Sequence, residues 1–222
     1  MSATLRIAVV DYGMGNRRSV QKALEHVGAQ AEVTSDHGLI QAADGIVLPG
    51  VGAFPLAMRN LVGLGLQDPI RACAAAGKPL LGICLGMQLL FERSEEFGVT
   101  EGLGLIAGEV TPLRTGGLRV PHIGWNEVEF ERPSRLTAGL PSAGCAFYHV
   151  HSLAARPSDP ADLVGSTTYG ERFATIVARE SVFGVQFHPE KSSAHGLRML
   201  EGFVALCRSD AAPAQPAAAL RT

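Results

Sequence analysis

The sequence predicts an α/β fold with an open, mostly parallel twisted sheet, helices on both faces and some antiparallel strands added to it. Three observations predict this class. Short apolar runs alternate with helical stretches up to about Gly102, several of these runs end in glycine-rich turns, and the later segments are short and separated by turn residues. The 222 residues, 46% of them hydrophobic, are enough to bury the core of one larger domain.

In the first half, the predicted elements follow from apolar runs and the loops after them. The run at residues 5–10 is followed by the glycine turn 11–16, which is typical of a strand leading into a helix. The run at 45–48 ends in Pro49-Gly50-Val51-Gly52, whose glycines permit unusual backbone angles. Strands are predicted at 5–10, 31–34, 45–48 and 79–83, and helices near 19–27, 55–76 and 85–91.

The second half predicts short strands and one closing helix. Apolar residues recur at helical spacing through 192–207, which favours an amphipathic helix. One domain is expected over residues 1–208, and the tail 209–222, rich in Ala and Pro, is predicted to be disordered. The predicted strands lie at 119–130, 145–150, 173–179 and 182–187.

Composition excludes several classes of partner. A formal net charge of -2, with both signs scattered along the chain, gives no basic surface for nucleic acid or anionic lipid. No apolar run approaches the roughly 20 residues of a spanning helix, and no signal-peptide pattern opens the chain, so a cytoplasmic protein is expected. The four widely spaced cysteines form neither a disulfide framework nor a C-x-x-C metal pattern.

Cys84 is the first candidate for chemistry. It stands in Gly82-Ile83-Cys84-Leu85-Gly86, between a predicted buried strand and a predicted helix. A nucleophile at such a sharp turn has a strained backbone, and side chains two residues before and after it would collide across the turn. The start of the helix also favours a thiolate and can stabilise an oxyanion. From the pentapeptide alone, this nucleophile elbow and a buried inert cysteine carry equal weight.

His188 is the candidate base for this thiol, with Glu190 as the carboxylate that orients it. His188 directly follows the predicted strand 182–187. Strand ends at one edge of a parallel sheet converge, so Cys84 and His188 are expected to meet there although they are distant in sequence.

These residues resemble a family. The motif Gly82-Ile83-Cys84-Leu85-Gly86-Met87-Gln88, together with His188-Pro189-Glu190, resembles the class I, or triad, glutamine amidotransferases. Four segments jointly resemble the glutaminase subunits of imidazole glycerol phosphate synthases, and the resemblance runs from about residue 7 to 207. These segments are 11–16, 49–54, 121–126 and 188–192.

The resemblance implies a glutaminase that needs no metal or cofactor. Cys84 would attack the side-chain amide of glutamine, His188 would carry the proton to the departing ammonia, and Glu190 would orient the imidazole. Water would then hydrolyse the thioester to glutamate. The oxyanion would be met by the backbone N–H of Leu85 and by an N–H of the loop that holds Gly50, Val51 and Gly52. We expect this loop to be a switch operated by a partner; a plain tight turn is the alternative.

The resemblance also implies a substrate pocket. Gln88, one helical turn after Cys84, would bind the amide of glutamine. Glu96 would bind its ammonium group, and His151 with Ser152 its carboxylate. Leu153 stands where an aromatic residue is frequent in the subfamily. His149 and His151 could also pair on a metal, but no third ligand has suitable spacing, so no metal is expected.

A partner is implied as well: the (βα)8-barrel cyclase subunit, in a heterodimer that uses the ammonia to make imidazole glycerol phosphate in histidine biosynthesis. The interface candidates are Asn16, Trp125 and Lys191, although Trp125 could instead line the core and Lys191 could be a solvated lysine. Three rival functions stay open. They are the glutaminase subunit of another triad amidotransferase (anthranilate, aminodeoxychorismate or pyridoxal phosphate synthesis), a non-catalytic module of the same fold, and a cysteine peptidase of similar architecture.

Overall fold

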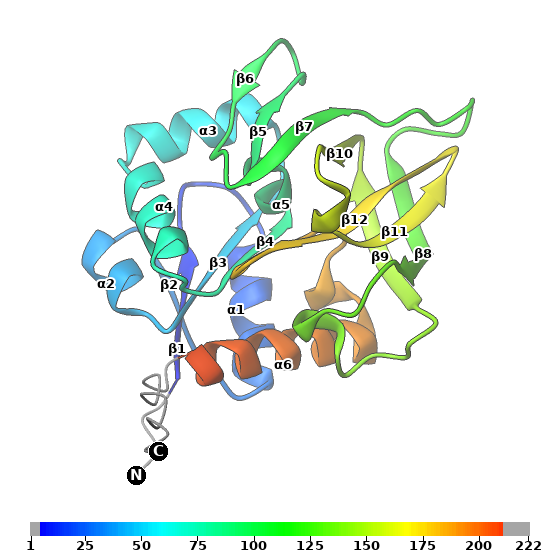
Figure 1. Ribbon diagram of the computed structural model, residues 1–222. Coiled ribbons are helices and arrows are strands. Elements are labelled where there is room, and N and C mark those ends of the chain that lie inside the picture. The colour runs from blue at the N-terminus through cyan, green and yellow to red at the C-terminus, as the bar shows by residue number, and fades with distance from the viewer. Residues whose placement is uncertain (1–4, 211–222) are drawn as a thin grey trace, which may run out of the picture.

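The computed structural model describes residues 5–210, which form one connected mixed sheet with helices on both sides (Figure 1). The helices are α1 (Arg17–His26), α2 (His37–Ala42), α3 (Phe54–Gly63), α4 (Gln67–Ala75), α5 (Leu85–Leu89) and α6 (Ser193–Asp210), with short 3-10 turns η1 (Arg135–Thr137), η2 (Pro160–Asp162) and η3 (Pro189–Lys191). The strands are β1 (Arg6–Val10), β2 (Gln30–Thr34), β3 (Gly45–Gly50), β4 (Leu80–Cys84), β5 (Phe91–Ser94), β6 (Thr100–Glu101), β7 (Ile106–Pro112), β8 (His122–Phe130), β9 (Cys145–His151), β10 (Leu153–Pro157), β11 (Leu163–Tyr169), β12 (Glu171–Arg179) and β13 (Val182–Val185).

The centre of the sheet is parallel. Strands β2, β1, β3, β4 and β13 lie side by side in that order, and all their pairings are parallel. Beyond β13 the sheet continues antiparallel through β12, β10 and β7, while β11, β8 and β9 form a branch from β12. The predicted fold class is therefore confirmed, including the antiparallel additions.

Two hydrophobic clusters hold the helices to the sheet. Successive residues of each buried strand face opposite sides, so Ala8 and Val10 of β1 join one cluster while Ile7 and Val9 join the other. The first cluster contains buried residues of α2, α3, α4 and α5, and the second contains those of α1 and α6. Figure 1 shows the blue α1 and the orange α6 close together, with the cyan α3 and α4 on the other side of the strands.

The structure corrects several predicted boundaries. The helix predicted at 55–76 is two helices, because the chain turns between α3 and α4 at Gly65, where φ is +63°. The helix predicted at 85–91 ends at Leu89, and Phe91 already belongs to β5. Helix α6 continues through Asp210 and so includes the first residues of the predicted tail, and residues 211–222 lie outside the described part.

Candidate active site

Cys84 sits on the sharp turn that its glycines predicted. It ends β4 and α5 begins at Leu85, and its own backbone has φ 55° and ψ -111°, an uncommon conformation for a residue with a side chain. A Cβ at Gly82 would lie 2.6 Å from the carbonyl oxygen of Gly86, and a Cβ at Gly86 would overlap the carbonyl oxygen of Leu48. Both glycines are therefore required for the turn to close against the sheet.

His188 reaches the same edge of the sheet. Strand β13 pairs in parallel with β4, with Val185 opposite Ile83, so the segment after Val185 emerges beside Cys84. The Nδ1 atom of His188 lies 2.8 Å from Oε1 of Glu190, and both side chains are fully buried. The structure thus brings together the three residues predicted to form a triad, which come from two neighbouring strand ends.

The surroundings of His188 favour its charged form. Burial lowers the pKa of the imidazole, but hydrogen bonding and charge attraction from Cys84 and Glu190 outweigh burial and raise the pKa to about 9. Its Nε2 atom, buried and without a directional hydrogen bond to a described residue, is the ring nitrogen that Glu190 leaves free. The thiol of Cys84 lies 3.8 Å from the carbonyl oxygen of Val150, to which it can donate a weak hydrogen bond.

The loop after β3 lies beside the nucleophile. Gly50 is the partner of Cys84 in the pairing of β3 with β4. The buried hydroxyl of Tyr12 donates a hydrogen bond of 2.6 Å to the carbonyl oxygen of Pro49, and a side chain at Gly50 would collide with that hydroxyl. Gly52 has φ +116°, which a residue with a side chain rarely adopts. The end of β3 is therefore fixed at Pro49, whereas Gly52, in the loop after it, permits unusual backbone angles.

A cavity of about 250 Å³ opens at Cys84. Its lining includes every residue predicted to bind glutamine, together with Leu85 and two residues of the oxyanion loop. The predicted residues that line it are Val51, Gly52, Cys84, Leu85, Gln88, Glu96, His151 and Ser152. A larger hollow of about 650 Å³ lies over residues 130–142, but Cys84 is not among its lining residues. The chemistry thus lies at the smaller cavity.

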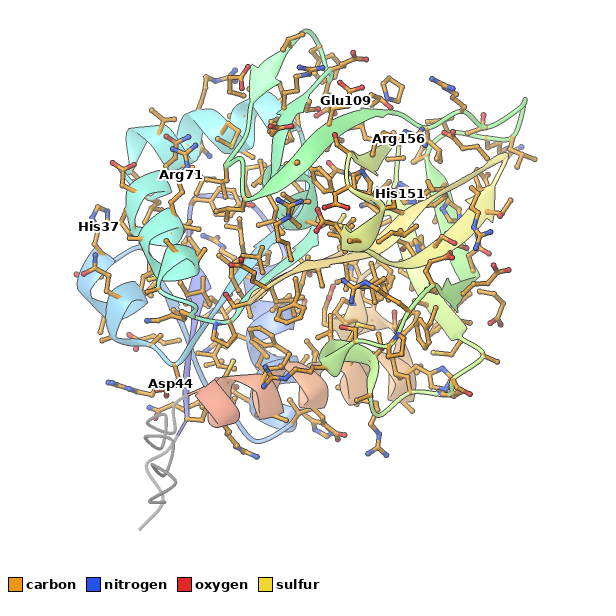
Figure 2. The ribbon with its side chains drawn as sticks, viewed as in Figure 1. His37, Asp44, Arg71, Glu109, His151 and Arg156 are labelled. Atoms are coloured by element: carbon orange, nitrogen blue, oxygen red, sulfur yellow. The ribbon has the colours of Figure 1, made fainter. Side chains whose placement is uncertain are left out.

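Two pocket residues have partners inside the protein. The Oε2 atom of Glu96 accepts a hydrogen bond of 2.6 Å from the backbone N–H of Phe54, which fixes this carboxylate at the start of α3. His151, labelled in Figure 2, lies in the interior beside strands β10 and β12. Its Nδ1 lies 2.7 Å from the carbonyl oxygen of Leu153 and its Nε2 lies 3.0 Å from Nδ1 of His122. Both ring nitrogens are thus engaged, which leaves backbone groups and Ser152 to face a ligand.

His151 belongs to a buried group of three histidines behind this wall. His122 stacks on His149 with ring centroids 5.1 Å apart, and His149 Nε2 lies 2.9 Å from the hydroxyl of Thr175. Burial lowers the pKa of all three imidazoles, that of His151 to about 4, so they are neutral at pH 7. Among residues 5–210, no group of three His, Cys, Asp or Glu side chains is arranged to hold a metal ion.

The three interface candidates lie in different settings. Asn16 points inward: its Nδ2 donates a hydrogen bond of 2.8 Å to Oε1 of Glu190 and lies 3.3 Å from Nδ1 of His188. Trp125, on β8, is 53% exposed, so it does not line the core. Lys191 is exposed at the end of η3, immediately after Glu190. Among residues 5–210, no helix has both the length and the apolar character needed to cross a membrane.

Sequence reasoning missed two residues at the nucleophile. Gln186, fully buried, places its Nε2 atom 3.8 Å from the sulfur of Cys84, and its Oε1 accepts a hydrogen bond of 3.0 Å from Nε2 of Gln88. Tyr12 lies in the segment 11–16 that contributes to the family resemblance, but its hydrogen bond joins it to Pro49, 37 residues away. The signal for Gln186 was a polar residue inside the apolar run 182–187, where burial without a partner would be costly.

Comparison with known proteins agrees with this site. The family model for "Glutamine amidotransferase class-I" matches residues 8–206. The chain therefore belongs to the class I glutamine amidotransferase family.

Within this family, two similar proteins carry the same name. The "Imidazole glycerol phosphate synthase subunit HisH" of Moorella thermoacetica is 54% identical over 202 residues, which cover 91% of this chain and 95% of the relative. The protein of the same name from Aquifex aeolicus is 48% identical over 200 residues, covering 90% and 96% of the two chains. A solved structure described as PurLQS from Thermotoga maritima superposes with a TM-score of 0.74 at 21% identity, covering 91% of this chain and 99% of that one, which bears on the fold alone.

Proposed function

We propose that this chain is the glutaminase subunit of an imidazole glycerol phosphate synthase, and that it releases ammonia from glutamine for a second subunit. The observation that carries the proposal is the meeting of Cys84, on its strand-to-helix turn, with the buried pair His188 and Glu190. Relatives about half identical over nine tenths of the chain carry that name, which supports the same assignment here.

The reaction begins with the thiolate of Cys84 attacking the side-chain carbonyl carbon of glutamine. The raised pKa of His188 favours a protonated imidazole beside the thiolate at neutral pH. As the tetrahedral intermediate collapses, the C–N bond breaks and His188 gives its proton to the departing ammonia. The neutral imidazole then takes a proton from water, the hydroxide attacks the thioester, and glutamate leaves as the thiolate and the protonated His188 are restored. Glu190 holds Nδ1 of the ring throughout.

The negative oxygen of both intermediates needs donors on the side of the pocket opposite the base. The N–H of Leu85, at the start of α5, is one such donor. The second is an N–H of the loop that holds Gly50, Val51 and Gly52, which lines the cavity. Because Tyr12 fixes Pro49 while Gly52 follows, we infer that a peptide flip after residue 49 completes the oxyanion site when a partner docks.

The pocket holds glutamine through the residues around it. Gln88 faces the amide end of the substrate and the carboxylate of Glu96 attracts its ammonium group. Ser152 and the backbone at 151–152 meet its carboxylate, because the imidazole of His151 is already bonded on both nitrogens. Hydrogen bonding at both ends would place the amide carbon against the sulfur of Cys84.

The partner that fits is a cyclase (βα)8-barrel subunit that receives ammonia directly. Val51 and Pro121 line the pocket, and further exposed apolar side chains lie close to Pro121 in the sequence, which indicates a surface that another chain covers. Asn16 is hydrogen-bonded to Glu190, and Lys191 follows Glu190 in the chain. A partner that contacts Asn16 or Lys191 would therefore affect the position of Glu190. The exposed apolar residues of this surface are Val51, Leu118, Val120, Ile123 and Trp125.

A glutaminase assay with and without a cyclase barrel and its nucleotide ligand tests the proposal. The wild-type chain should hydrolyse glutamine slowly alone and faster with the cyclase, and Cys84→Ala should abolish turnover in both conditions. Cys73→Ala is the matched control, since Cys73 is a buried cysteine on α4 without the elbow glycines. Turnover in Cys84→Ala, or no response to the cyclase, would contradict the proposal.

A further inference from the structure

Gln186 joins the nucleophile to the substrate pocket through one side chain. It lies two residues before His188 in the segment that follows β13, and its backbone N–H donates to the carbonyl oxygen of Thr175, which fixes its main chain to β12. Its side chain is fully buried. A buried carboxamide needs partners for both ends, and here the partners are Gln88 on one side and the sulfur of Cys84 on the other.

The direction of these contacts is set by chemistry. A thiolate accepts hydrogen bonds, so the amino end of Gln186 must face Cys84, and the carbonyl end then accepts from Nε2 of Gln88. A rotation of the carboxamide by half a turn would bring its oxygen against the sulfur and its amino group against that of Gln88. With Gln88 as placed, both contacts would become repulsive, so both favour the observed orientation of Gln186.

The same orientation prepares Gln88 for substrate. Gln88 lies one helical turn after Cys84 on α5 and lines the cavity. With one N–H given to Gln186, its carbonyl oxygen and its second N–H are left to face the pocket. The carboxamide of Gln88 therefore presents a fixed acceptor and a fixed donor to a bound amide.

We propose that Gln186 is a positioning residue of the glutaminase site, which orients the Gln88 amide for substrate and holds the Cys84 sulfur with a hydrogen bond from Nε2. This inference rests on the proposed function for its effect on glutamine, but its effect on the sulfur can be measured without turnover. When the wild type and a variant are compared, the other titratable groups around the sulfur must be the same in both proteins. They are Tyr12 after β1, Glu96 and His151 in the pocket wall, and His188 with Glu190.

Alkylation of Cys84 tests the contact with the sulfur. The full chain is treated with iodoacetamide from pH 5 to 9, and the alkylation of Cys84 is measured by peptide mass spectrometry, because the chain has three other free cysteines. In Gln186→Met the midpoint of the pH dependence should move up by about one pH unit, as expected for one hydrogen bond lost from a charged acceptor. Gln41→Met, at an exposed position of α2, is the control and should follow the wild type.

Glutamine kinetics with the cyclase test the contact with Gln88. Gln186→Met should raise KM about fivefold, the effect of one neutral hydrogen bond, and should also lower kcat. Gln88→Met should raise KM but leave the alkylation midpoint where it is, because Nε2 of Gln186 still reaches the sulfur. A merely structural role would lower Tm in the Gln186 variant without moving the midpoint.

Two outcomes are decisive. If folded Gln186→Met keeps the wild-type midpoint and KM, the inference is wrong while the proposed function stands. If the midpoint moves but the wild type never hydrolyses glutamine, the proposed function is wrong while the contact with the sulfur stands. Should the apolar variant not fold, Gln186→Asn replaces it, because it keeps a carboxamide that is one carbon too short for both partners; a wild-type midpoint and KM there overturn the inference equally.

Discussion

Acid should weaken the fold through His151, by an amount that its surroundings set. Burial, as the largest effect, lowers the pKa of this imidazole from 6.5 to about 4, although its bond to Leu153 opposes the shift. Between pH 6.5 and 4 the unfolded chain therefore binds a proton that the folded chain excludes, so stability falls as pH falls through this window. From pH 8 to pH 5 the loss from His151 alone is about 2 kcal/mol. His149 shifts in the same direction and adds to the loss.

Urea unfolding at pH 8, 6.5 and 5 measures this effect. His151→Gln removes the titrating ring, so the variant should lose about 2 kcal/mol less than the wild type between pH 8 and pH 5, whatever its stability at pH 8. His26→Gln, at an exposed position near the end of α1, should follow the wild type. If His151→Gln and the wild type lose the same free energy of unfolding, the neutral buried state of His151 is refuted.

Three further predictions concern the backbone and the triad. Gly86→Ala should lower the free energy of unfolding by about 1–3 kcal/mol, because the new Cβ overlaps the carbonyl oxygen of Leu48, whereas Gly63→Ala, with open space around it, should be nearly neutral in the same thermal unfolding by circular dichroism. Tyr12→Phe should cost about 1–3 kcal/mol in urea unfolding, because the buried carbonyl of Pro49 loses its donor; an unchanged midpoint would show that another donor replaces the hydroxyl. Asn16→Gly, which keeps the positive φ of 76°, should lower kcat for glutamine about tenfold with little change in Tm, because Glu190 loses a charge-assisted hydrogen bond, and a wild-type kcat would argue against that role.

The parallel half of the fold could be predicted because its signals are local. The strands β1, β3 and β4 are buried on both faces, so they appear in the sequence as continuous apolar runs. Strand β10 gave no such signal, because its sequence LAARP gains its order from long-range pairing, with Ala155 opposite Val110. The break between α3 and α4 was also missed, since apolar spacing continues across it and only the positive φ of Gly65 ends the first helix.

The site divides in the same way. Cys84 was predictable because its turn demands glycine on both sides, and His188 because it follows a buried apolar strand, β13. The partners of His151 were not, because its bond to His122 depends on the register that sets these two residues opposite each other in β8 and β9. Residue type indicated which side chains carry chemistry, whereas the directions of their hydrogen bonds depend on strand pairing that the sequence does not display.

Burial lowers the pKa of both His151 and His188, but at His188 other interactions outweigh burial, which explains how the triad stays charged. Buried imidazoles are normally neutral, and His151 follows that rule. His188 departs from it because Glu190 and Cys84 both attract its positive charge. Since His151 and His149 are near enough for their charges to oppose that of His188, each proton they gained would compete with it. The neutral histidines therefore protect the charge of His188, and acid that protonates them should weaken the fold and the triad in the same pH window.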